Sequence, residues 1–97
     1  MAYDPGAIEA TLAAAAGSNA ALIDELRDAF AESAHRALRA ITSAQTDADW
    51  HAATQRLRGL AASFGAVRLM ALAEEASQAP CGDGRILQRL RRAVSRF

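Results

Sequence analysis

The sequence predicts an all-α protein, an up-down antiparallel four-helix bundle with a short additional helix at its N-terminus. Three observations lead to this prediction. Alanine, leucine and arginine are abundant among the 97 residues and β-branched residues are few, which favours helix over strand. Apolar residues recur at three- and four-residue spacing along most of the chain. The breaks between these stretches are short, and short loops between long amphipathic helices make neighbouring helices antiparallel.

The first two predicted helices are marked by their ends. Asp4-Pro5 fits an N-cap followed by proline in the first turn, and it opens a short helix with Ile8 and Leu12 one turn apart. Gly17-Ser18-Asn19 ends that helix and caps the next, which we expect from about Ala20 to Thr42. The apolar stripe of this second helix consists of Ile23, Leu26, Phe30, Ala34, Ala37 and Ile41.

Three more helices complete the predicted bundle. One begins near Thr46 or Asp47, and the next spans about Ala66 to Gln78. The last follows a break from Pro80 to Gly84 and runs to the C-terminus. The residues expected to face inward on these helices are Trp50, Ala53, Leu57, Leu60 and Phe64, then Leu69, Leu72 and Ala76, then Ile86, Leu87, Leu90, Val94 and Phe97.

Length, hydropathy and charge limit the function. Residues 1–97 suffice for one domain. No run approaches the roughly 18 apolar residues of a membrane span, and no signal peptide is visible, so we expect a cytoplasmic protein that does not contact membranes. The formal net charge is zero, which predicts no general attraction to nucleic acid. The single cysteine, Cys81, lies in a predicted loop and is interpreted as an incidental thiol.

The outward face of the third helix has an unusual composition. At about 100° per residue, Gln55 points away from the apolar cluster, with Gly59 and Ala62 on the same face. Arg58 also lies on this face, and His51 lies one turn before Gln55. Glycine within a helix costs about 1 kcal/mol relative to alanine. A partner that approaches the helix backbone closely would explain Gly59, and a tolerated glycine or a slight bend is the alternative.

The same helix carries a motif that resembles the one in histidine-containing phosphotransfer (HPt) domains. The motif is Thr54-Gln55-Arg56-Leu57-Arg58-Gly59, followed by Phe64-Gly65-Ala66. In that family the histidine is followed by leucine two residues later, lysine or arginine three later, and glycine four later. A large apolar residue and a glycine come nine and ten residues after it. The family residues are matched by Leu57, Arg58, Gly59, Phe64 and Gly65, whereas Gln55 stands at the histidine position.

The resemblance extends over the helix plan from about Asp4 to Ala79 and implies a function. In HPt domains the histidine accepts a phosphoryl group from an aspartate of a receiver domain and passes it to another receiver. Arg58 would then help to offset phosphate charge, or else be an ordinary solvated charge, and Gly59 would leave room for the receiver. The Gln55 amide nitrogen is not a useful nucleophile, because its lone pair is delocalised into the carbonyl.

The resemblance therefore implies a pseudo-HPt regulator or decoy of two-component phosphorelay systems, and not an enzyme. We expect it to dock a response-regulator receiver domain or a histidine kinase through Gln55, Arg58, Gly59, Ala62 and His51, as a monomer or weak homodimer. Two alternatives stay open. The bundle is a structural or dimerisation unit that uses its alanine-rich faces, or it relays phosphate through His51, about 6 Å from Gln55 along the helix axis.

Other chemistry is not indicated. The cysteine and histidines do not have the spacing of metal ligands, and no glycine-rich phosphate loop follows a strand, so we expect no metal and no cofactor. The last helix carries a basic stripe. We expect this stripe to face solvent or to pair with acidic side chains of neighbouring helices, in preference to nucleic acid or an anionic membrane. Its members are Arg85, Arg89, Arg92 and Arg96.

Overall fold

Helices make up nearly all of the regular structure. The computed structural model describes residues 10–12, 14 and 19–97. Over these residues there is no strand, which confirms the all-α class. The helices are α2 (Ala20–Ser43), α3 (Asp47–Ser63), α4 (Val67–Ser77) and α5 (Gly84–Val94). None of the described helices has the length and hydropathy needed to cross a membrane.

The predicted boundaries of α2, α3 and α4 hold to within one residue, whereas the last helix is shorter than predicted. It ends at Val94 and does not continue to the C-terminus. The predicted short N-terminal helix, including its cap at Asp4-Pro5 and its apolar residue Ile8, falls largely outside the described residues. Leu12, its other apolar residue, is described and fully buried, so this part of the chain contributes to the core.

Capping side chains explain where the helices begin. Asn19 Oδ1 accepts a hydrogen bond from the backbone N–H of Leu22 at 3.0 Å, which satisfies one of the free donors at the start of α2. Thr46 Oγ1 does the same for the start of α3, and Asp83 Oδ1 for the start of α5. After α3, Gly65 adopts φ 71°, a left-handed conformation that favours glycine and turns the chain into α4.

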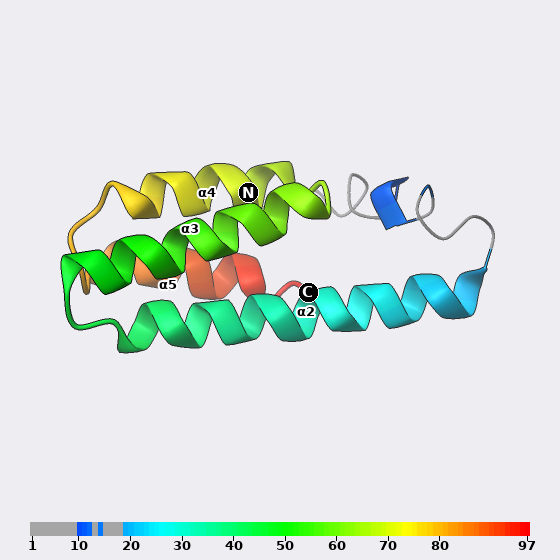
Figure 1. The fold of residues 1–97 in the computed structure, drawn as a ribbon, viewed down its shortest axis with the longest axis horizontal. Helices are drawn as coiled ribbons and strands as arrows, with labels where there is room; N and C mark the ends of the chain where they lie inside the picture. The colour runs from blue at the N-terminus through cyan, green and yellow to red at the C-terminus, as the bar shows by residue number, and fades with distance from the viewer. Residues whose placement is uncertain (1–9, 13, 15–18) are drawn as a thin grey trace.

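The helices pack in adjacent pairs (Figure 1). α3 lies against both α2 and α4, and α5 also lies against α2 and α4, so each of these four described helices has two main neighbours. The rings of Phe30, Phe64 and Phe97 join α2, the end of α3 and the C-terminal residues. Phe30 lies 4.8 Å from Phe64 and 4.7 Å from Phe97 between ring centroids. These contacts place Phe97 inward, as predicted, although the helix has already ended.

The interface between α3 and α4 fixes the orientation of α3. The buried Trp50 indole donates a hydrogen bond from Nε1 to the carbonyl oxygen of Ala76 at 2.8 Å. Thr54 is also fully buried, and its hydroxyl donates to the Trp50 carbonyl at 2.9 Å. The inward face of α3 is therefore centred on Trp50, Thr54 and Leu57. Leu60 and Phe64, which were expected to face inward, pack against the core at the edge of this face and are half-buried.

Candidate functional site

The exposed side of α3 carries a row of small side chains, which is bordered by the exposed His51, Arg56 and Arg58. Gly59 and Ala62 are exposed, as the helical periodicity predicted, and Gln55, one turn before Gly59, is half-buried. Further small residues on this outward side are Ala48, Ala52 and Ser63, all exposed. We call the surface of these six residues the Gln55 face. Solvent-facing helix positions usually carry long polar side chains, so small residues around Gln55 are unusual, and the longer side chains of His51, Arg56 and Arg58 lie at the borders of this face.

Gly59 has no structural reason to be glycine. A Cβ placed there would meet no atom of the described residues within 4 Å beyond its chain neighbours and its own helix backbone. Its φ is not positive, unlike those of Gly65 and Gly82. Alanine at this position would stabilise the helix by about 1 kcal/mol without a clash. Of the two glycines in the motif, Gly65 is thus explained by the turn, whereas Gly59 is not explained by the fold.

The border of the Gln55 face toward α4 holds two of the predicted site residues. Arg58 Nε lies 3.2 Å from Glu74 Oε2, and both side chains are about half exposed. His51 Nδ1 lies 3.4 Å from the carbonyl oxygen of Ser77. Because a carbonyl oxygen only accepts, this contact favours the proton on Nδ1 and leaves the lone pair on Nε2. Arg58 and His51 therefore belong to the edge of the face and both contact α4.

The border toward α2 holds a cation that the sequence analysis did not single out. Arg56 is exposed and forms no ion pair or hydrogen bond among the described residues. It lines two adjoining hollows of about 290 Å³ and 270 Å³, and Ala52 lines the smaller one. The only signal in the sequence was its position directly after Gln55, which places it about 100° around the helix. Arg56 is thus the unpaired cation beside the Gln55 face, whereas Arg58 is paired with Glu74.

The side chains at this face can bind a partner through hydrogen bonds and charge. The Gln55 amide can donate and accept hydrogen bonds but offers no nucleophile. Within the described part of the chain, no three His, Cys, Asp or Glu side chains are grouped closely enough to hold a metal ion. Cys81 lies in the loop before α5, half-buried, with its thiol 3.3 Å from the Ala44 carbonyl oxygen, which fits a packing role.

The resemblance to HPt domains therefore depends on the motif residues and on the geometry of α3. Five motif positions agree in type, Gly59 is exposed as docking would require, and Gln55 lies among small residues. Comparison of the chain with protein-family models, with curated proteins and with solved structures found no match.

Proposed function

We propose that this protein is a pseudo-HPt module of two-component signalling, which docks a receiver domain or a histidine kinase through the Gln55 face and does not carry phosphate. In this proposal residues 1–97 form one cytoplasmic domain, an up-down antiparallel four-helix bundle. The single observation that carries the proposal is Gly59, an exposed glycine inside a helix with open space around it. A partner that contacts the helix backbone would account for its stability cost.

The composition of the Gln55 face supports close docking. Alanine, glycine and serine leave the backbone of α3 near the surface, so a partner loop can approach it. Gln55 would supply one hydrogen-bonding group at the centre, close to the position where the family's histidine meets the receiver's aspartate. Docking would therefore survive the loss of the nucleophile, and the protein would compete with true phosphotransfer proteins for a receiver.

The two bordering arginines support binding of an acidic partner. Arg56 is unpaired among the described residues, so it can contact a partner carboxylate directly. Arg58 would have to give up its ion pair with Glu74 in order to contact a partner carboxylate. A half-exposed ion pair of this kind contributes only about 0.2–1 kcal/mol, so the exchange would cost little.

A receiver-binding experiment with charge-matched variants tests the proposal. Receiver domains from the same cell would be titrated with the wild-type protein, with Gly59→Arg and with Gln88→Arg. Gln88 is an exposed residue of α5, so its variant adds the same charge on a different helix. We expect Gly59→Arg to weaken binding at least about tenfold, since a large side chain would separate the two surfaces. Gln88→Arg should bind like the wild type. The proposal fails if no receiver binds above background or if Gly59→Arg binds normally.

A second experiment asks whether the nucleophile alone has been lost. With a phosphorylated receiver as donor, Gln55→His should acquire acid-labile label, because it restores an imidazole at the centre of the face. The wild type should remain unlabelled. Label in the wild type that disappears in His51→Ala would instead support relay through His51, whose Nε2 is left with the lone pair by the contact to Ser77.

A further inference from the structure

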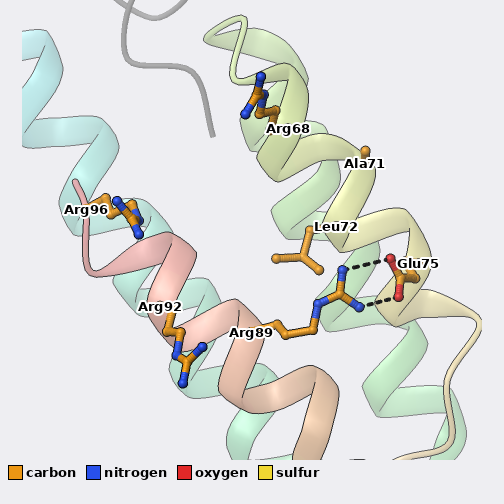
Figure 2. A pocket seen from close by; sticks show the side chains of 7 residues that line it. All are labelled: Arg68, Ala71, Leu72, Glu75, Arg89, Arg92 and Arg96. Atoms are coloured by element: carbon orange, nitrogen blue, oxygen red, sulfur yellow. Dashed lines mark hydrogen bonds and ion pairs between the residues drawn. The ribbon is translucent and has the colours of Figure 1, made fainter. Parts of the chain in front are cut away.

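A groove between α4 and α5 collects positive charge from both helices. It has a volume of about 530 Å³ and is lined by Arg68, Ala71, Leu72, Glu75, Arg89, Arg92 and Arg96. Figure 2 shows Leu72 between the two helices, Arg68 and Arg96 toward one end, and Arg89 reaching across to Glu75. Four arginines and one glutamate give this groove a formal charge of +3, in a chain whose formal net charge is zero.

Among the described residues, two of the groove's four arginines have no partner. Arg89 donates hydrogen bonds to both carboxylate oxygens of Glu75, one of them at 3.2 Å. The hydrogen bond from Arg89 lowers the pKa of Glu75, and the carboxylate raises the pKa of Arg89, so both stay charged at neutral pH. Arg68 and Arg92, by contrast, have no ion-pair or hydrogen-bond partner within residues 19–97.

The position of Arg68 is unfavourable unless an anion is nearby. It lies in the first turn of α4, where the helix dipole is positive and a cation is disfavoured. This helix also has no acidic residue in its first turn and no side-chain cap. Arg92 differs, because the last turn of α5 favours a cation. A bound anion between the two helices would offset the positive charges of Arg68 and Arg92.

We propose that this groove binds a small, soluble anion with two or more phosphate groups. Guanidinium groups bind phosphate oxygens in pairs with matched geometry, and a diphosphate balances several of them at once. The groove volume lies within the usual range of small-molecule sites. The buried Leu72 side chain and Ala71 offer an apolar floor beside the charges. The site shares no residue with the Gln55 face and stands independently of the docking proposal.

Isothermal titration with pyrophosphate, and with ADP as a second probe, tests this site. We expect saturable binding of one ligand per chain at low salt. Arg68→Gln and Arg92→Gln should each weaken binding about tenfold, the loss expected for one charge-assisted contact. Arg85→Gln and Arg91→Gln are the matched controls, because both are exposed arginines of α5 outside the groove. They should change the affinity less than about twofold.

Glu75→Gln should raise the affinity for pyrophosphate, whereas the arginine substitutions should lower it. It removes the one negative charge among the described residues that line the groove and releases Arg89, so it should strengthen pyrophosphate binding by about fivefold. All variants alter exposed side chains, and circular dichroism would verify that they remain helical. Absence of saturable pyrophosphate binding to the wild type, or an equal loss in the control variants, would overturn the proposal. Tighter binding of duplex DNA, of a polyglutamate peptide or of anionic phospholipid vesicles through Arg68 and Arg92 would overturn it too.

Discussion

Replacing Gly59 by alanine tests whether the fold requires glycine at this position. If it does not, the variant should be more stable than the wild type, and the glycine is explained better by a binding partner. The added Cβ would meet no described atom within 4 Å beyond its neighbours and helix backbone, and the helical φ suits any residue. The gain then comes from helix propensity and from a less flexible unfolded chain, together about 1 kcal/mol. For a domain of this size, the midpoint of thermal unfolding should rise by about 4–8 °C.

Gly82 provides the matched control for this experiment. A Cβ there would also meet open space, but φ is +82°. Gly82→Ala should therefore destabilise the protein by about 1 kcal/mol, because an L-residue is strained in the left-handed region. Thermal and urea unfolding, followed by circular dichroism, measure both variants. If Gly59→Ala lowers the unfolding midpoint as Gly82→Ala does, the fold itself requires Gly59 and the main support for docking is lost.

Three further outcomes are expected. Trp50→Phe should lower the free energy of unfolding by about 1–3 kcal/mol in urea titrations, because the hydrogen bond from the indole to the Ala76 carbonyl is lost and the smaller ring leaves a cavity, although the Ala79 N–H still donates to that carbonyl. An unchanged stability would contradict the role given to this side chain. The pKa of Glu75 is held below its ordinary value by Arg89, so the pair's contribution to stability is present above about pH 4.5 and is lost as the pH falls through the lowered value. An NMR titration of the Glu75 carboxyl should show this lowered pKa, and Arg89→Gln should return it to normal. Sedimentation should show a monomer or weak homodimer, and a tight homodimer that buries the Gln55 face would favour the structural alternative over docking.

Local signals in the sequence predicted the helices well because the ends are encoded by neighbouring residues. Asn19, Thr46 and Asp83 cap α2, α3 and α5 through their own side chains, so their types and positions suffice. The inward position of Phe97, beyond the end of α5, depends instead on a distant contact. Phe97 packs against Phe30, and that contact cannot be inferred from residues near the C-terminus.

The same distinction applies to the two candidate sites. Helical periodicity alone was enough to place Gly59 and Ala62 on the outward side of α3. The pairing of Arg58 with Glu74 depends on the register between α3 and α4, so periodicity could not reveal it. Arg68 likewise joins the arginines of α5 only because α4 and α5 pack together. Pairs of charged residues that meet across a helix interface can therefore be identified only from the structure, whereas the residues that share one face of a helix can be predicted from the sequence.

The hydrogen bond between Trp50 and Ala76 also provides a built-in optical probe. Trp50 is the single tryptophan of the chain, and its indole is buried where α3 meets α4. It lies on the inward side of α3, whereas Gln55 lies on the outward side. Its fluorescence therefore reports on this one interface without any label. Variants of the Gln55 face that leave the emission spectrum unchanged alter only the surface. A shift to longer wavelength would instead show that α4 has moved away from α3.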